Sequence, residues 1–200
     1  MTTGRLEAFS DGVLAILITI MVLELRPPEG TSMAALRDLL PVFFSYVLSF
    51  VYLGIYWNNH HHLLQATERV NGGILWANLH LLFWLSLFPF TTAWMGEHSF
   101  AAVPVAVYGA VYFGAAIAYF VLQRSIVHTQ GMDSRLAAAL GSDFKGKASP
   151  VLYLAAIALS FANRWVAVAL YVVVALMWLV PDRRVENIFH ESTGPVPNAD

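Results

Sequence analysis

This chain of 200 residues contains no cysteine, and only 12% of its residues are charged. Without cysteine there are no disulfides, no thiolate metal sites and no cysteine nucleophile, and the redox compartment is left open. Average soluble domains carry about 25% charged residues. The low charge, the 58% of hydrophobic residues and a mean hydropathy of +0.62 therefore indicate an integral membrane protein with one helical domain. A net charge of -2 gives no indication of nucleic-acid binding.

The apolar runs predict an all-α protein with six transmembrane helices. Their ranges are about 6–25, 42–60, 74–95, 103–123, 151–162 and 165–180. Pro89 lies inside the third range and predicts a bend there. A proline at membrane depth is acceptable where neighbouring helices satisfy the backbone carbonyl that it frees. The last two ranges are separated only by Asn163 and Arg164, which favours a tight hairpin. Residues 1–182 thus form one transmembrane domain, and residues 183–200 are expected to be a disordered cytoplasmic tail.

The distribution of basic residues between the loops predicts the orientation. If both termini face the cytoplasm, eight Lys and Arg residues lie inside: Arg5, Arg69, Arg124, Arg135, Lys145, Lys147, Arg183 and Arg184. Three lie outside: Arg26, Arg37 and Arg164. This bias supports six spans in a plasma membrane. If residues 151–180 were instead one long helix, the C-terminus would move outside and the bias would fall to six against five.

The first span carries polar residues where apolar ones are expected. Only the twelve residues 12–23 form an uncharged run, whereas a helix needs about 20 to cross the bilayer core. The helix therefore spans only if it begins near Arg5 and includes Glu7, Ser10 and Asp11. Ionisable groups at membrane depth cost roughly 2.5 kcal/mol or more, and they usually mark a functional site with a partner. The acidic residues also argue against a cleaved signal peptide.

The first helix has two different faces when its residues are projected at about 100° each. Ile16, Ile20 and Leu23 fall roughly 120–180° away from Asp11, and Thr19 falls between the two faces. One face can therefore bond to polar groups of neighbouring helices while the other presents an aliphatic stripe. From spacing alone, the stripe is most simply a contact with other helices or with lipid. Asp11 would then serve only to fix packing, and in either case its burial requires a partner.

Three blocks of residues together resemble a known family. They are Arg5-x-x-x-Phe9-Ser10-Asp11 in the first helix, Trp57-Asn-Asn-His60-His61 closing the second, and Asn78 with Phe88-Pro89-Phe90-Thr91 in the third. This pattern is similar to the signature of the transmembrane protein 175 family, which are potassium channels of endosomes and lysosomes with shorter bacterial relatives. A single six-helix set resembles the bacterial branch.

The resemblance implies a homotetramer whose pore is lined by the first helix of each subunit. Like the family, the chain has no Thr-Val-Gly-Tyr-Gly filter. By the family's spacing, Ile16, Ile20 and Leu23 would form a hydrophobic constriction that gates by dewetting. Thr19 would provide a ring of hydroxyls that helps to select potassium. The expected partners are further copies of the chain, the lipid bilayer, and K+ with other monovalent cations, and no cofactor is expected beyond permeant K+.

The same resemblance implies a polar network that holds the first helix in place. Its expected members are Arg5, Phe9, Ser10, Asp11, Trp57, His60, His61 and Asn78. The histidine run at 60–62 does not predict a metal site, because adjacent residues point in different directions on a helix and metal pairs favour i, i+4 spacing. One of these histidines is expected to pair with the network around Asp11.

Two other functions remain open at the level of sequence. A secondary transporter would also place Asp11 and histidine in its interior, but it usually shows two matched repeats with interrupted helices, and no repeat is visible in the chain. An integral-membrane enzyme would need a nucleophile or a metal cluster, for which only the histidine run is a candidate. The predicted activity, as the family resemblance implies, is potassium conduction without catalysis.

Overall fold

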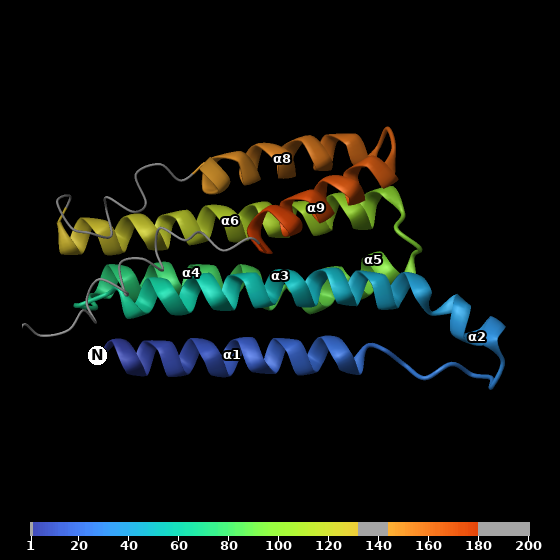
Figure 1. Ribbon diagram of the computed structural model, residues 1–200, viewed down its shortest axis with the longest axis horizontal. Helices are drawn as coiled ribbons and strands as arrows, with labels where there is room; N and C mark the ends of the chain where they lie inside the picture. Colours follow the sequence, from blue (N-terminus) through green and yellow to red (C-terminus); the bar gives the residue numbers. More distant parts are fainter. Residues whose placement is uncertain (1, 132–143, 180–200) are drawn as a thin grey trace, which may run out of the picture.

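The computed structural model describes residues 2–131 and 144–179, and within these ranges the regular structure is entirely helical. The helices are α1 (Thr3–Leu23), α2 (Met33–Asp38), α3 (Leu40–Gln65), α4 (Gly72–Ser86), α5 (Phe88–Glu97), α6 (Ala102–Gln130), α8 (Phe144–Ser160) and α9 (Arg164–Leu179). The long helices lie side by side and alternate in direction (Figure 1). The prediction of an all-helical fold is confirmed.

Helix α1 lies along one side of the bundle and packs against α3, α4 and α5 (Figure 1). Its buried residues are Leu6, Ser10, Leu14, Leu17 and Met21. They recur every three or four positions, so they form one stripe along the helix. The opposite side of α1 is therefore not covered by the described part of the chain.

The third predicted helix, residues 74–95, is divided into α4 and α5 at Leu87. Pro89 occupies the second position of α5 and has no backbone N–H, so it cannot continue the hydrogen-bond ladder of α4. The backbone N–H of Thr91 donates to the carbonyl of Leu87 at 3.1 Å, which starts the new helix. The helix is therefore interrupted at Leu87, where the sequence predicted only a bend.

Two other helices are longer in the structure than the sequence predicted. Helix α6 continues seven residues beyond position 123, to Gln130. Its last turns are fastened to the α3–α4 connection: Asn71 Nδ2 donates to Thr129 Oγ1 at 2.9 Å, and Gln130 Nε2 donates to the carbonyl of Ala66 at 2.8 Å. Gly131, with a φ of 101°, ends the helix in a conformation that favours glycine.

Helix α8 begins at Phe144 rather than at residue 151, and Pro150 lies inside it. The turn before this proline is held by Ser149, whose hydroxyl donates to the carbonyl of Lys145 at 2.8 Å. The same hydroxyl accepts a hydrogen bond of 2.8 Å from the indole of Trp178 on α9. Contact with α9 therefore supports a helical turn that local sequence does not favour.

Helices α8 and α9 form an antiparallel hairpin joined by residues 161–163 (Figure 1). Asn163 caps α9 by accepting a 3.0 Å hydrogen bond from the backbone N–H of Trp165. The alternative of one continuous helix over 151–180 is therefore wrong. The predicted tail at 183–200 and the basic residue Arg135 lie outside the described residues.

The centre of the bundle is an aromatic cluster shared by α3, α5, α6 and α9. The ring of Tyr112 stacks on Phe88 and Tyr108, with centroid distances of 4.0 and 4.2 Å. Tyr52 Oη donates to the carbonyl of Tyr171 at 2.6 Å, and Tyr171 Oη donates to the carbonyl of Val105 at 3.1 Å. These hydrogen bonds satisfy polar groups that would be costly to bury without a partner.

Four segments are long and apolar enough to cross a membrane by length and composition: Thr3–Leu23, Leu40–Gln65, Gly72–Glu97 and Ala102–Gln130. Helix α9 is apolar but shorter, with 16 residues. The broken helix α4–α5 thus counts as one candidate span. A multi-pass membrane protein follows from these lengths.

We expect Gly109→Ala to destabilise the bundle by about 1–3 kcal/mol, because overpacking has this cost. A Cβ at Gly109 would collide with Tyr171 and lie 2.9 Å from Ile157 Cγ1, whereas a Cβ at Gly54 would have nothing within 4 Å in the chain. Thermal unfolding of the purified protein measures the difference, with Gly54→Ala as the matched control. Equal unfolding temperatures for the two variants would contradict the packing described for α6 and α9.

Candidate functional site

Helix α1 is attached to α3, and to Thr67 just beyond the end of α3, by three side-chain contacts at regular intervals along α1. Thr3 Oγ1 donates to the carbonyl of Thr67 at 3.2 Å. Glu7 Oε1 lies 2.7 Å from His61 Nδ1. Further along, Trp57 Nε1 donates to Asp11 Oδ1 at 3.1 Å. Because the helices are antiparallel, residues that advance by four along α1 meet partners that recede from Thr67 to His61 and then to Trp57, and the contacts fix the register of α1.

A second set of hydrogen bonds connects α1 to α3 and α4 through the protein interior. Asn78 Nδ2 donates to Ser10 Oγ at 3.0 Å, and Ser10 Oγ donates to the carbonyl of Leu6 at 2.9 Å. The Oδ1 atom of Asn78 lies 2.7 Å from His60 Nε2. Since the amide oxygen is an acceptor only, His60 carries its proton on Nε2 in this arrangement. Ser10, His60 and Asn78 are all buried.

These two sets account for most residues of the predicted polar network, but they divide them into separate groups. Ser10, His60 and Asn78 form the buried group, while Asp11, Trp57 and His61 lie nearer the surface. The ring of His61 also stacks on that of Trp57, with centroids 5.9 Å apart. Among the described residues, His60 is thus linked to Asn78 by a hydrogen bond rather than to Asp11.

The other predicted members lie differently. Arg5 is exposed, and its guanidinium forms no hydrogen bond or ion pair with any residue of 2–131 or 144–179. Phe9 is exposed as well. Their part in the network stays a prediction. A further histidine, His80 on α4, is exposed and accepts a 3.0 Å hydrogen bond from Trp84 Nε1 on its own helix.

Glu7 is a residue of the network that the predicted set lacks. Glu7 and Asp11 are four positions apart on α1, and their partners His61 and Trp57 are four positions apart on α3. Two polar side chains at i and i+4 share a face of each helix. This matched spacing on two antiparallel helices is a signal in the sequence that indicates paired contacts.

The predicted aliphatic stripe lies on the uncovered side of α1. Ile16, Ile20 and Leu23 have exposed fractions of 58%, 39% and 77%. Within a single chain nothing described covers this large apolar surface, and such surfaces mark contacts with lipid or with other proteins. The stripe therefore faces away from the helices that hold α1.

Thr19 is exposed on the same side of α1. Its hydroxyl donates to the carbonyl of Ile16 at 2.8 Å, one turn back on the helix. The hydrogen of the hydroxyl is thereby used within the helix, and the lone pairs of its oxygen remain directed outward. Such an oxygen can serve as a ligand to a cation or as an acceptor for water.

Small residues occupy the first half of the uncovered side. Gly4, Ala8 and Gly12 are exposed and follow each other at intervals of four. A Cβ added at Gly4 or Gly12 would have no atom of residues 2–131 or 144–179 within 4 Å. Small residues at this spacing let membrane helices approach closely. Helix α1 can thus pack tightly against another helix near its start and present bulkier side chains near its end.

Among the described residues, no group of three or more His, Asp or Glu side chains is placed to hold a metal ion. His60 and His61 are directed to different partners, Asn78 and Glu7. What the site provides is a helix fixed on one side and uncovered on the other. The uncovered side combines a hydroxyl with large aliphatic groups, which is the surface needed to line a narrow path.

Comparison with known proteins identifies relatives over most of the chain. Residues 5–89 match the family described as endosomal/lysosomal potassium channel TMEM175. A potassium channel of Chryseobacterium sp. (strain P1-3) is 55% identical over 192 residues, which cover 96% of this chain and 100% of that protein. A potassium channel of Chamaesiphon minutus is 33% identical over 191 residues, covering 87% of this chain and 92% of that protein.

A solved structure is similar in fold as well as in sequence. It is the crystal structure of a lysosomal potassium-selective channel TMEM175 homolog from Chamaesiphon minutus. The match has a TM-score of 0.79 and 30% identity, and it covers 90% of this chain and 97% of that one. The family match, residues 5–89, includes the side chains that bond Glu7, Ser10 and Asp11 of α1 to α3 and α4.

We expect Asp11 and Trp57 to be coupled by about 1 kcal/mol in a double-mutant cycle, because a hydrogen bond to a carboxylate at a partly exposed position has this order of strength. The cycle uses Asp11→Ala and Trp57→Phe, which removes the indole donor, and it measures the free energy of unfolding in detergent. Asp11→Ala combined with Trp165→Phe, on α9, is the control and should be additive. Additivity of the first pair would show that the contact does not hold α1.

Proposed function

This chain belongs to the TMEM175 family, and from that premise we propose that it is a potassium channel in which α1 of four identical subunits lines the pore. The activity is ion conduction and not catalysis. The observation that carries the proposal is the division of α1 into two sides. Hydrogen bonds to α3 and α4 fix one side, while Ile16, Ile20 and Leu23 are exposed on the other.

Assembly is a requirement of this proposal, because one chain has one α1 and cannot enclose a path with it. The small residues Gly4, Ala8 and Gly12 support close approach of α1 helices from different subunits. A ring of four such helices would hide the apolar surface that a single chain exposes. The partners are therefore further copies of the same chain, within the lipid bilayer.

The proposed gate is the aliphatic stripe. Rings of Ile16, Ile20 and Leu23 would form a constriction from which water withdraws. An ion would have to lose its hydration shell to enter it, and the apolar side chains offer no replacement, so the constriction blocks conduction. Opening then needs only a small rotation or displacement of α1. The contacts with α3 and α4 oppose such a movement, so the polar network of Ser10, Asp11, Trp57 and Asn78 would set how easily the gate opens.

Thr19 is proposed to contribute to selectivity. It lies between Ile16 and Ile20 in the sequence, so its hydroxyl oxygen would form a polar ring within the constriction. Four oxygens at one level can replace part of the hydration shell of a potassium ion. No bound cofactor is needed, and the permeant K+ is the only ligand of the pore.

We further propose six spans in the plasma membrane with both termini in the cytoplasm. The alternating directions of the helices bring the start of α1, the α3–α4 turn, the end of α6 and the start of α8 to one end of the bundle (Figure 1). The segments at this end carry more Lys and Arg residues than the opposite end, where Arg26, Arg37 and Arg164 lie. This distribution favours the first end as cytoplasmic.

Recording from the purified protein in planar bilayers tests the proposed function directly. With opposed potassium and sodium gradients, we expect unitary currents that reverse toward the potassium equilibrium potential. Smooth fluxes without unitary steps would favour a transporter and would refute the channel.

Ile16→Ser should increase potassium flux several-fold, because a small polar side chain wets a hydrophobic constriction. Potassium flux into liposomes measures the effect at equal amounts of reconstituted protein. Ile117→Ser changes an exposed isoleucine on α6 and should leave flux unchanged. Reduced or unchanged flux in Ile16→Ser would remove this residue from the gate.

Thr19→Val should weaken the preference for potassium over sodium, since valine keeps the shape of threonine but lacks its oxygen. The reversal potential under a mixed potassium–sodium gradient measures the preference. Thr19→Ser keeps the hydroxyl and should retain most of the wild-type value. A reversal potential that is the same in wild type and Thr19→Val would exclude Thr19 from the filter.

A further inference from the structure

A long apolar groove lies between α3 and α9, with one end at the turn that joins α5 to α6. Helices α8 and α9 lie along the edge of the bundle opposite α1 (Figure 1). The volume of the groove is about 770 Å³, whereas an apolar cavity of roughly 150 Å³ holds one benzene molecule. The groove is therefore large enough for a chain molecule.

One wall of the groove is a stripe along α9. Its residues recur every three or four positions and so share one side of the helix. They are Trp165, Val168, Val172, Ala175, Leu176 and Leu179. From the first to the last of them the helix rises about 21 Å at roughly 1.5 Å per residue, while one leaflet of the hydrocarbon core is about 15 Å thick. The wall is thus long enough for an acyl chain that extends from the headgroup region to the bilayer midplane.

The facing wall is the first half of α3. Phe44, Val47, Leu48 and Val51 line it, and all four are apolar. The α9 stripe beyond Trp165 is apolar as well. A ligand in this part of the groove would be held by apolar contact alone, which suits a hydrocarbon chain.

The polar groups of the groove gather at one end. Arg164 is the first residue of α9, and Ser99 belongs to the α5–α6 turn. The rings of Phe100 and Trp165 lie 5.7 Å apart, so the turn and the start of α9 are neighbours. Because tryptophan is enriched at the level of lipid headgroups, we expect this end of the groove to lie at the membrane surface.

Arg164 gives this end a positive charge that the chain does not balance. Its side chain is exposed and forms no ion pair with an acidic residue of 2–131 or 144–179. The guanidinium lies 5.4 Å from the ring centroid of Trp165, which lines the groove. The N-terminus of α9 adds a partial positive charge, and none of the described lining residues is acidic. An anionic group of a ligand would complement this end.

Ser99 adds a hydroxyl at the same end. Ser99 and Phe100 have φ values of 47° and 59°, which are uncommon for residues other than glycine. The turn buries the ring of Phe100 and leaves Ser99 exposed. Within the part of the chain that the structure describes, the hydroxyl has no hydrogen-bond partner, and it can donate to an anionic oxygen.

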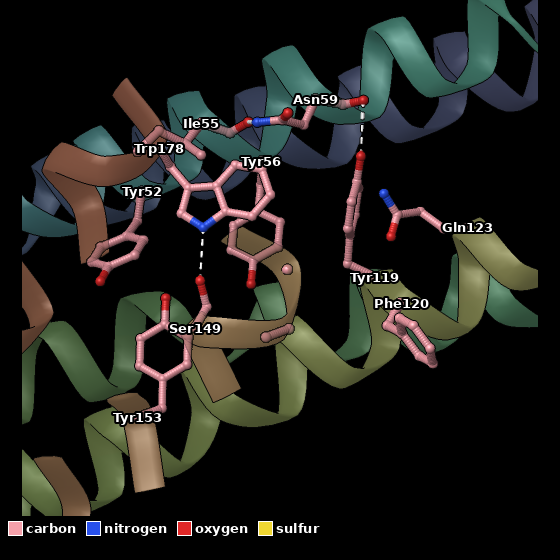
Figure 2. Close-up of a pocket in the computed structure, with 12 residues that line it drawn as sticks. Tyr52, Ile55, Tyr56, Asn59, Tyr119, Phe120, Gln123, Ser149, Tyr153 and Trp178 are labelled. Atoms are coloured by element: carbon pink, nitrogen blue, oxygen red, sulfur yellow. Dashed lines mark hydrogen bonds between the residues drawn. The ribbon is translucent and has the colours of Figure 1, made fainter. Parts of the chain in front are cut away.

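Contacts on another side of α9 keep the groove in place without a ligand. Trp178 Nε1 donates to Ser149 Oγ on α8 at 2.8 Å, and Figure 2 shows the indole nitrogen turned toward this hydroxyl. Tyr171 Oη donates to the carbonyl of Val105 on α6 at 3.1 Å. These bonds fix the rotation of α9 and leave its apolar stripe uncovered. A preformed site lowers the entropic cost of binding.

We propose that the groove binds one membrane phospholipid with an anionic headgroup. The phosphate would contact the guanidinium of Arg164, because arginine binds phosphate through two parallel N–H donors. It would also accept a hydrogen bond from Ser99. One acyl chain would lie along the α9 stripe, against Phe44 and Val51 of α3.

A helix of a second subunit is the other occupant for an apolar groove in a membrane. In the proposed tetramer α1 lines the axis, so the edge formed by α8 and α9 is outermost and faces lipid (Figure 1). This step rests on the proposed function. The charge of Arg164 favours a phospholipid without it, because an apolar helix has no group to balance that charge.

Native mass spectrometry of the full-length protein in detergent tests the binding, with palmitoyl-oleoyl phosphatidylglycerol as the probe. Phosphatidylcholine with the same chains has the phosphate but no net charge. We expect one saturable phosphatidylglycerol per subunit and about tenfold weaker binding of phosphatidylcholine. Equal binding of the two lipids overturns the proposal. Displacement by glycerophosphoglycerol, the headgroup without chains, also overturns it, because the phosphate alone would then suffice.

Variants assign the binding to the groove. Arg164→Gln should weaken phosphatidylglycerol binding about tenfold, to the level of phosphatidylcholine, whereas Arg26→Gln, at the same end of the bundle outside the groove, should bind as wild type. Val172→Trp should block both lipids by filling the groove. Val173→Trp is its control, since Val173 is exposed on the same helix but does not line the groove.

Unchanged lipid binding in both Arg164→Gln and Val172→Trp would overturn the assignment. The comparison of the two lipids on the wild-type protein stands even if a variant fails to fold. Loss of subunits in Val172→Trp but not in Val173→Trp would show that a second copy fills the groove, and would overturn the proposal.

The same spectra report the number of subunits, which separates this proposal from the proposed function. Preferential binding of phosphatidylglycerol to a complex without four subunits would refute the tetramer and leave the lipid site standing. A tetramer that shows no preference between the lipids would overturn the lipid site alone.

Discussion

The attachment of α1 to α3 and α4 is the interaction on which the rest of the molecule depends. A helix with three polar side chains in its first turns cannot lie freely in a bilayer, because unpaired polar groups at membrane depth are costly. Asp11, Glu7 and Ser10 meet Trp57, His61 and Asn78, and this pairing is possible in one rotation of the helix only. The same rotation directs Ile16, Ile20 and Leu23 away from the bundle.

The remaining helices support this attachment in layers. The aromatic cluster of Tyr52, Tyr108, Tyr112 and Phe88 joins α3 to α5 and α6, so the helix that holds α1 is itself held. Close approach at Gly109 and Gly114 brings α9 and Trp84 onto α6. In a membrane, where lipid offers helices no hydrophobic reason to associate, such close packing and interhelical hydrogen bonds provide the stability.

Much of the fold and of the site follows from local sequence. The uncharged runs predict the helices, and the angular positions of residues in the first span separate Asp11 from the aliphatic stripe. The family resemblance drawn from Arg5-x-x-x-Phe9-Ser10-Asp11 and the histidine and asparagine blocks is confirmed by relatives that match most of the chain. Absence of cysteine excludes disulfides and thiol chemistry, and scarcity of charge indicates an integral membrane protein.

Contacts between distant segments decided what the sequence by itself did not. Whether His60 meets Asp11 or Asn78 depends on how α3 and α4 are rotated, and the structure pairs it with Asn78. The helical turn before Pro150 exists because Trp178 contacts Ser149 from α9. The groove beside Arg164 requires α3, α9 and the α5–α6 turn at once. In each case a residue's partner lies on another helix, whereas the pattern of a single helix determines only which side of that helix the residue occupies. The stripe of Ile16, Ile20 and Leu23 was therefore predictable from the sequence, and the groove was not.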